Sequence, residues 1–206
     1  MIVKKFLGFG FESNVYLIIS HKKALIDCGT GFYNDELLKK LKEIDRIDYI
    51  ILTHEHFDHC GGAKEIKEKM SAKLCMHENG AEVLEKGLSW SAAFFGTTQP
   101  KVKVDIKLKE GDEIDLGNVK LKVIYTPGHS KGSMCLYEKN SKSLFSGDTI
   151  FAYGNVGRTD FYGGNIKELI ASIKKIRKYD IQNLYPGHGD YILKNGKMHI
   201  EMAEKF

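Results

Sequence analysis

Hydrophobic positions along the first third of the chain follow two alternating spacings, one typical of strands and one typical of helices. Short apolar runs bounded by polar turns predict strands at 15–20, 24–27, 48–52 and 73–76. Between them, apolar residues recur every three or four positions and predict helices at 34–44, 63–70 and 78–86. This alternation predicts an α/β arrangement in which helices pack outside sheets.

Residues 87–102 interrupt the alternation. Trp90, Phe94 and Phe95 lie there among glycine and proline, a composition typical of a loop with hydrophobic anchors. Further apolar runs predict strands at 103–108, 119–125, 133–137, 143–145 and 183–185, and helical spacing predicts helices at 166–177 and 197–205. Two halves of this kind would form two sheets packed face to face, with helices on both outer sides.

The segment THEHFDH, residues 53–59, crowds titratable side chains directly behind an apolar strand. Residues two apart in a strand share a face, so His54 and His56 are expected to point the same way from its end. Asp58 and His59 would face a neighbouring direction if the chain then turns into a helix. A divalent cation would neutralise this crowding, and zinc favours such ligands. A histidine-rich surface turn is the alternative.

Three later segments repeat one pattern: an apolar strand, small residues, and a side chain that can bind a metal. His129 follows TPG, Asp148 follows SG and His188 follows PG. Proline and glycine form tight turns, which would hold each side chain at the end of its strand. Together the four strand ends supply these candidate ligands: His54, His56, Asp58, His59, His129, Asp148 and His188.

The pattern H-x-H-x-D-H, followed by separate His, Asp and His segments, resembles the metallo-β-lactamase-fold hydrolase superfamily. Segments 13–18 and 24–29 contribute to the resemblance, which covers nearly the whole chain. We therefore expect one domain over residues 1–206. The resemblance implies a four-layer αββα sandwich of two mixed β-sheets flanked by helices, with metals at one edge between the sheets.

The resemblance also implies two divalent ions per chain. One would be held by His54, His56 and His129, the other by Asp58, His59 and His188, and Asp148 would bridge both. Asp27 matches the family's acid that fixes a ligand imidazole by accepting its other N–H. The alternative for Asp27 is an exposed turn residue before Gly29. Zinc is favoured, and iron and manganese accept the same nitrogen and oxygen ligands.

Within the superfamily, the chain is most similar to the short glyoxalase II-like, or hydroxyacylglutathione hydrolase-like, branch. The segment NVGRTDF, residues 155–161, resembles this branch and the persulfide dioxygenases. The resemblance implies that two ions activate a bridging water, which cleaves a thioester or a related acyl substrate. Asp58 and Asp148 are the candidate catalytic carboxylates, and Asp58 would help to orient the nucleophile.

Other functions fit the pattern less well. An iron-dependent persulfide dioxygenase, an oxidoreductase, would hold one iron through His56, His129 and Asp148, and it is the main alternative. A structural zinc site is disfavoured because such sites are normally closed tetrahedra, often rich in cysteine. β-Lactamase activity is disfavoured because Asp148 stands where one main class of these enzymes has cysteine.

Arg158 is the candidate substrate-binding residue, because a guanidinium group suits a carboxylate. Its alternative is an ion pair with Asp160 that braces the loop. The aromatic residues of the 87–102 loop would either line one wall of the site or pack in the core. Tyr153 and Tyr162 are candidates for the opposite wall.

Charge, the length of apolar runs and the distribution of cysteines limit the classes of partner that this protein is expected to bind. The 31 basic and 27 acidic side chains leave a net charge of +4, which does not favour nucleic acid binding. No signal peptide is visible, and the longest apolar run is far below the ~20 residues of a membrane span.

Scattered cysteines indicate reduced thiols, and Cys60 is expected to pack in the core. We expect a cytoplasmic enzyme for a small-molecule thioester or thiol-derived substrate, without nucleic acid or membrane partners. Oligomeric state is not indicated.

Overall fold

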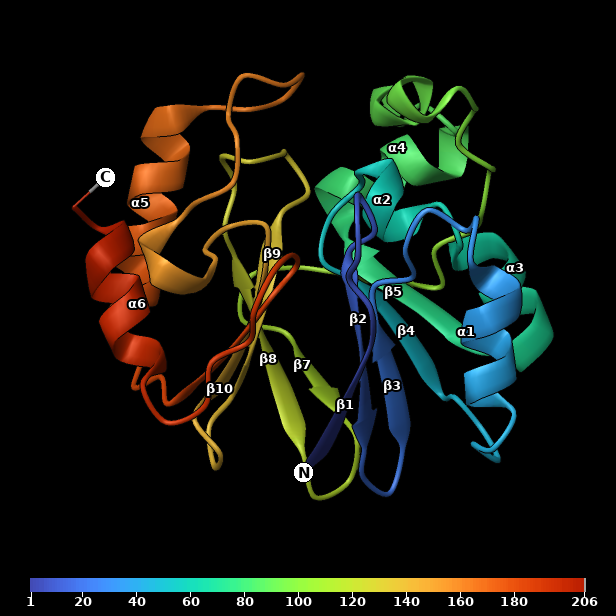
Figure 1. Cartoon of the computed structure of the whole chain (residues 1–206), viewed down its shortest axis with the longest axis horizontal. Coiled ribbons are helices and arrows are strands. Elements are labelled where there is room, and N and C mark those ends of the chain that lie inside the picture. The colour runs from blue at the N-terminus through green and yellow to red at the C-terminus, as the bar shows by residue number, and fades with distance from the viewer. Residues whose placement is uncertain (206) are drawn as a thin grey trace.

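Two β-sheets packed face to face form the centre of the molecule (Figure 1). The computed structural model describes residues 1–205. The strands of the first sheet lie in chain order: β1 (Ile2–Leu7), β2 (Asn14–Ile19), β3 (Lys23–Ile26), β4 (Tyr49–Leu52), β5 (Lys73–His77) and β6 (Ile106–Leu108). The second sheet has the order β11 (Asn183–Pro186), β10 (Ser143–Gly147), β9 (Met134–Glu138), β8 (Lys120–Tyr125) and β7 (Glu113–Asp115). Each sheet combines parallel and antiparallel pairs, so both are mixed.

Helices cover the outer side of each sheet (Figure 1). Those beside the first sheet are α1 (Asn34–Leu41), α2 (Phe57–Cys60), α3 (Ala63–Met70) and α4 (Glu78–Lys86). Those beside the second are α5 (Ile166–Ile176) and α6 (Gly196–Ala203). Two short 3₁₀ helices in the described chain, η1 (Trp90–Phe95) and η2 (Ala152–Gly154), lie in connecting loops. The predicted αββα sandwich is confirmed.

Alternation along the strands explains the layers. In β2, Val15 and Leu17 belong to the core between the first sheet and its helices, whereas Tyr16 and Ile18 belong to the core between the sheets. A strand whose successive side chains point to opposite faces is apolar throughout when both faces are covered. A third core lies between the second sheet and α5 and α6. Burial on both faces therefore produces the continuous apolar runs seen in the sequence.

Most predicted elements occur with small shifts at their ends, and α3 and α4 have the predicted bounds. The helix predicted at 34–44 ends at Leu41, and the strand predicted at 103–108 begins at Ile106. Strands β1 and β7 and helix α2 were not predicted. Within residues 1–205, no helix has the length and apolar character that a membrane crossing requires.

The start of β2 is joined to the end of β11. The Asn14 side-chain amide donates to the Pro186 carbonyl at 2.9 Å, and the Asn14 backbone N–H donates to the Gly187 carbonyl at 2.6 Å. The Tyr16 hydroxyl donates to the same Pro186 carbonyl at 2.8 Å. These bonds connect the two sheets and fix the turn that carries His188.

Candidate metal centre

The predicted ligands converge from the ends of four strands, β4 in the first sheet and β8, β10 and β11 in the second. Three groups form in which all candidate ligand atoms lie within 4.8 Å of one another, and two of these groups share no residue. We call His54, His56 and His129 the first cluster, and Asp58, His59 and His188 the second cluster. A third such group, His54, His59 and Asp148, overlaps both.

The local geometry of the first histidines differs from the prediction. Strand β4 ends at Leu52, so strand alternation is not the reason that His54 and His56 meet, although both side chains do reach the same cluster as expected. Instead, His56 is the extended residue directly before α2, with φ −72° and ψ 145°. The short helix α2 then carries Asp58 and His59 to the second cluster. An irregular turn followed by one helical turn thus divides the segment between the clusters.

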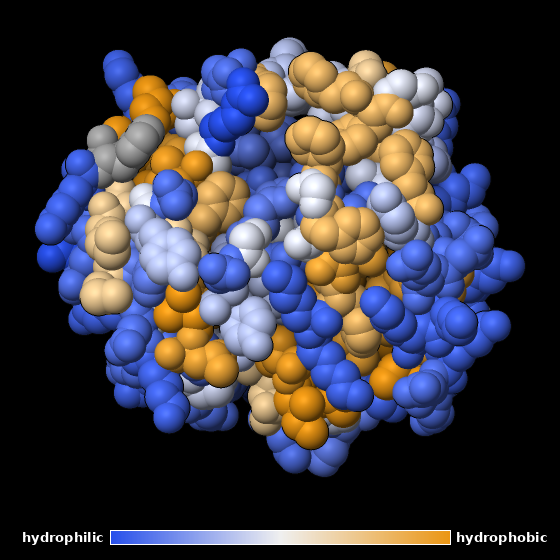
Figure 2. All heavy atoms as spheres, viewed as in Figure 1, coloured by the Kyte–Doolittle hydropathy of each residue, from blue (hydrophilic) through white to orange (hydrophobic). Residues whose placement is uncertain are grey.

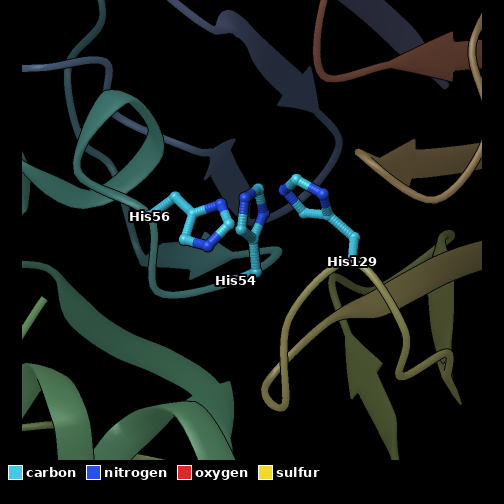
Figure 3. A group of neighbouring side chains, drawn as sticks. All are labelled: His54, His56 and His129. Atoms are coloured by element: carbon cyan, nitrogen blue, oxygen red, sulfur yellow. The ribbon is translucent and has the colours of Figure 1, made fainter. Parts of the chain in front are cut away.

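Figure 3 shows the three imidazoles of the first cluster turned toward one another, with His129 approaching from the second sheet. Their ring centroids are 4.5 to 4.8 Å apart. Within the described residues, all three Nε2 atoms are buried without a hydrogen-bond partner. A buried polar atom without a partner is costly, and a metal ion would satisfy all three at once.

Burial sets the protonation of the first cluster. It lowers the pKa of His56 to about 3 and also lowers the pKa of His54 and of His129, with neighbouring histidines adding to the effect. These imidazoles are therefore neutral at physiological pH, which is the form that binds metals.

Hydrogen bonds at the far ring nitrogens orient two of these histidines. The Nδ1–H of His129 donates to the Arg158 carbonyl at 2.7 Å. The Thr53 hydroxyl donates to Asp27 at 2.8 Å and lies 3.1 Å from His54 Nδ1, whose N–H it can accept. Both contacts leave an Nε2 lone pair directed into the site, as expected for a metal ligand.

The second cluster is held by charge. His188 Nε2 lies 3.0 Å from Asp58 Oδ2 and 3.2 Å from His59 Nε2. Burial alone would lower the pKa of His59, but Asp148, Asp27 and Asp58 together raise it well above its usual range. The cluster therefore combines carboxylate and imidazole ligands in the close contact that a cation would mediate.

Asp148 lies between the clusters. Its Oδ2 is 3.6 Å from His129 Nε2 in the first cluster and 3.6 Å from His188 Nε2 in the second. Its Oδ1 is 3.2 Å from His59 Nε2. Burial opposes ionisation of Asp148, yet His59, His188 and His129 keep its pKa well below its usual range. One ionised carboxylate thus reaches both clusters, and the donor set fits metal binding.

Asp27 supports the second cluster from outside. Its side chain is buried, with 1% of the residue exposed, so the exposed-turn alternative is wrong. It accepts from His59 Nδ1 at 2.8 Å and from the Thr53 backbone N–H at 2.8 Å. Its φ of 59° is left-handed, a conformation that costs about 1–2 kcal/mol for a residue with a side chain. The hydrogen bonds of the Asp27 carboxylate to both Thr53 and His59 offset this backbone strain.

Several positioning residues were not predicted from the sequence. The buried Glu55 carboxylate accepts from the Ser130 hydroxyl at 2.9 Å and from the Gly132 N–H at 3.3 Å, which ties the His54–His56 segment to the His129 loop. A Cβ at Gly187 would overlap Asp148 Oδ1, and one at Gly157 would lie 2.8 Å from His129 Nδ1. These glycines let the backbone approach the ligands closely, and no local sequence pattern distinguishes them from ordinary turn glycines.

The same arrangement of segments occurs in known proteins. A family model described as the metallo-beta-lactamase superfamily matches residues 8–188. The chain belongs to the metallo-β-lactamase superfamily.

Relatives of this superfamily member carry hydrolase names. "Probable metallo-hydrolase MJ0888" of Methanocaldococcus jannaschii is 38% identical over 196 residues, covering 92% of this chain and 93% of that protein. Hydroxyacylglutathione hydrolase GloC of Haemophilus influenzae is 29% identical, covering 88% of this chain and 87% of that protein. Acyl-coenzyme A thioesterase MBLAC2 of Homo sapiens is 29% identical, covering 91% of this chain and 76% of that protein.

Solved structures of the superfamily share the whole fold. The BLEG-1 B3 metallo-β-lactamase superposes with a TM-score of 0.84 at 28% identity, covering 95% of both chains. TTHA1623 in a di-iron-bound form gives a TM-score of 0.78 at 30% identity, covering 93% of this chain and 94% of that one. ETHE1 from Myxococcus xanthus gives a TM-score of 0.76 at 25% identity, covering 100% of this chain and 85% of that one. The fold is thus shared by this metallo-β-lactamase superfamily member, and one of these structures is described with iron. Zinc, iron and manganese stay open for this chain.

Above the metal centre of this superfamily member lies a cavity of about 740 Å³. Its floor includes side chains of both clusters and Asp148. Its remaining lining is largely aromatic: Phe11, Trp90, Phe94, Phe95, Phe151 and Phe161. The loop aromatics therefore line a wall of the site. Tyr153 and Tyr162 do not line this cavity, so their assignment to the opposite wall was wrong.

Arg158 lines the cavity but is already paired. Its Nε and Nη2 atoms donate to the Asp160 carboxylate at 2.9 and 2.6 Å, and its guanidinium lies 4.2 Å from the centre of the Phe161 ring. The predicted ion pair between Arg158 and Asp160 is present, and contact of Arg158 with a substrate stays a prediction. Cys60 is buried, with Sγ donating to the Glu55 carbonyl at 3.3 Å, and it packs in the core beneath the cluster.

Proposed function

We propose that this protein hydrolyses thioesters at a dinuclear metal centre. The observation that carries the proposal is the position of Asp148, whose two oxygens lie 3.2 to 3.6 Å from imidazoles of both clusters. In a mononuclear site this carboxylate would contact one ion only, and its approach to the second cluster would be unused. The names of two relatives, a hydroxyacylglutathione hydrolase and an acyl-coenzyme A thioesterase, support thioesters as the substrate class.

Each residue of the site has a distinct role under this proposal. The first cluster would hold one ion, the second cluster the other, and Asp148 would contact both. Two divalent ions, when bound, supply a water of lowered pKa and a Lewis acid for the thioester carbonyl. Asp27 and the Arg158 carbonyl keep His59 and His129 in the correct tautomer and orientation. Asp58, at the cavity floor, would also help to orient the attacking water.

The leaving group suits this set of residues. A thiol has a pKa near ~8.5, so a thiolate departs with little help from a general acid. The carboxylates Asp58 and Asp148 can therefore stay ionised and serve as ligands. Neighbouring histidines lower the pKa of both against the effect of burial, which supports that state.

The proposed metal is zinc, with iron and manganese as alternatives. The ligands are imidazoles and carboxylates without cysteine, which all three metals accept. The proposed substrate is a small-molecule thioester or thiol-derived compound, and the proposed setting is the cytoplasm. Free, buried thiols at Cys28, Cys60, Cys75 and Cys135 support a reducing setting.

Element analysis of natively purified protein, combined with thioester turnover, tests the proposal. We expect two metal ions per chain and release of thiol from S-lactoylglutathione or an acyl-coenzyme A, with Asp148→Asn as the inactive control. A fully metal-loaded protein that is inert toward both glutathione and coenzyme A thioesters would contradict it. One iron per chain with oxygen consumption on glutathione persulfide would instead support the dioxygenase alternative.

A further inference from the structure

An aromatic surface leads from the solvent to the metal centre. We call Phe11, Trp90, Phe94 and Phe161 the aromatic wall; all four line the cavity. Figure 2 shows apolar atoms gathered at the upper right, beside a central hollow, in the region where η1 lies in Figure 1. The wall therefore combines residues from three distant parts of the chain: the loop before β2, η1, and the loop before α5.

The aromatic wall begins at the metal ligands. The Trp90 ring centroid lies 5.5 Å from that of His56, and the Phe161 centroid lies 6.0 Å from it. Trp90 and Phe161 are 5.0 Å apart, and Phe94 packs on both at 5.2 and 5.9 Å. A group bonded to a carbonyl at the first cluster would thus meet aromatic faces directly.

The outer part of the wall is exposed although it is apolar. Phe94 is 70% exposed and Phe11 is 82% exposed. Single exposed apolar residues are common, but a contiguous group at the rim of a concave site marks a surface that a ligand covers. Burying these rings against an apolar ligand would be favourable.

The charges around the cavity do not favour a charged group against this wall. Outside the two clusters and Asp148, Arg158 is the cationic side chain among the described residues that line the cavity. Its guanidinium donates two hydrogen bonds to the Asp160 carboxylate and lies over the Phe161 ring. Carboxylates or phosphates of a thiol carrier would find no unpaired cationic side chain among the described residues of this wall, so the polar half of a thioester is expected on the solvent side.

We propose that the aromatic wall binds the acyl group of the substrate, and that this group is apolar: a medium-length aliphatic chain or an aromatic ring. This inference rests on the proposed thioester hydrolysis and narrows its substrate class. The cavity volume of about 740 Å³ is that of sites that enclose drug-sized ligands, far more than a short hydroxyacyl group requires.

A series of N-acetylcysteamine thioesters tests the proposal, because the thiol is small and constant while the acyl group varies. Each methylene that is fully buried is worth about fourfold in binding. With half of that burial, kcat/KM is expected to rise on the order of 50-fold from acetyl to octanoyl. The complementary series, with acetyl held constant and the thiol varied, is expected to change kcat/KM by less than about threefold.

Phe94→Ala and Tyr162→Ala provide a matched pair. Both remove an exposed aromatic ring, and Tyr162 directly follows Phe161 in the chain, but the Tyr162 ring does not line the cavity. Phe94→Ala is expected to lower the octanoyl-to-acetyl ratio of kcat/KM about fivefold or more, because the octanoyl chain loses burial and ring contacts. Tyr162→Ala is expected to leave the ratio unchanged.

Binding supplies a readout that does not require catalysis. Trp90 is the single tryptophan of the sequence and part of the wall, so its fluorescence reports occupancy. Titration with non-hydrolysable ketone analogues is expected to change the emission with the octanoyl compound at concentrations at least about tenfold below the acetyl compound.

The outcomes separate the two proposals. Turnover of thioesters without dependence on acyl size, or an equal effect of Phe94→Ala and Tyr162→Ala, overturns the acyl site and leaves thioester hydrolysis intact. Failure to hydrolyse any thioester contradicts the proposed function, and the fluorescence titration then still decides whether the wall prefers the apolar group.

Discussion

The two clusters lie side by side but are built in different ways. The first is made of neutral imidazoles whose buried Nε2 atoms have no partner in the described chain. Hydrogen bonds from the Nδ1 side, to a hydroxyl and a carbonyl, orient two of the three rings. The second contains its own carboxylate, and its members already contact one another as charged pairs. The first cluster therefore depends on a cation more strongly than the second, which can balance its charge with protons.

Replacing the carboxylate that the clusters share is expected to have the largest effect. Asp148→Asn keeps the shape but removes the negative charge, and kcat for thioester hydrolysis is expected to fall about 10³-fold, or about 4 kcal/mol. Metal analysis is expected to show less than the full complement. Asp180→Asn, which alters an exposed carboxylate paired with Lys142, is the control and should leave both values unchanged. Activity of D148N within tenfold of the parent would contradict a shared role.

Removal of the metal is expected to lower the stability of the fold. An ion bound at about 100 times its dissociation constant adds about 2.7 kcal/mol, which is about 5–10 °C in Tm for a chain of this size. Dialysis against a chelator followed by calorimetry measures the shift, and re-addition of zinc should reverse it. The same shift in a His56→Ala variant would show that the first cluster contributes nothing to it.

Replacing the residues that hydrogen-bond to the ligand imidazoles is expected to lower the metal affinity of one cluster more than that of the other. Asp27→Asn weakens the acceptor at His59, so the second cluster is expected to lose about 10- to 100-fold in affinity. Thr53→Val removes the hydroxyl beside His54 and is expected to cost the first cluster about tenfold. Competition with a chromogenic chelator resolves two binding steps. Loss of both steps to the same extent in each variant would mean that the clusters act as one site.

The smallest effect is expected at Glu55. Glu55→Gln replaces one acceptor oxygen by an NH₂ group that faces existing donors, so a buried hydrogen bond is lost at a cost of about 1–3 kcal/mol. Thermal unfolding should show a Tm lower by about 2–10 °C, while kcat stays within about threefold. A large fall in kcat with unchanged Tm would instead assign Glu55 to the chemistry.

The elements that short stretches of sequence determine could be predicted from the sequence. Helices α3 and α4 and the strand ends at His129, Asp148 and His188 were predictable because hydrophobic spacing and tight turns are encoded within a few residues. Strand β7 was missed because its three residues contain one apolar side chain, Ile114. Strand β1 pairs only with β2 at the edge of its sheet in the described chain, so its partly exposed pattern gives a weak signal.

Long-range convergence could not be predicted without the resemblance. Trp90 and Phe94 were recognisable as loop anchors, but Phe11 and Phe161 join them only because distant loops meet over the cavity. The carbonyl of Arg158 orients His129, and a backbone group leaves no trace in the identity of the residue. Such contacts depend on the packing of the two sheets, which periodicity does not specify.

The bond between the Asn14 side chain and the Pro186 carbonyl joins residues 172 positions apart. Bringing such remote segments together removes more chain entropy than closing any short loop, and the compensating contacts form only once both sheets exist. On a ribosome, the imidazole of His188 emerges long after those of His54, His56 and His129. The reactive centre is therefore completed late in maturation, after the scaffold around it has formed.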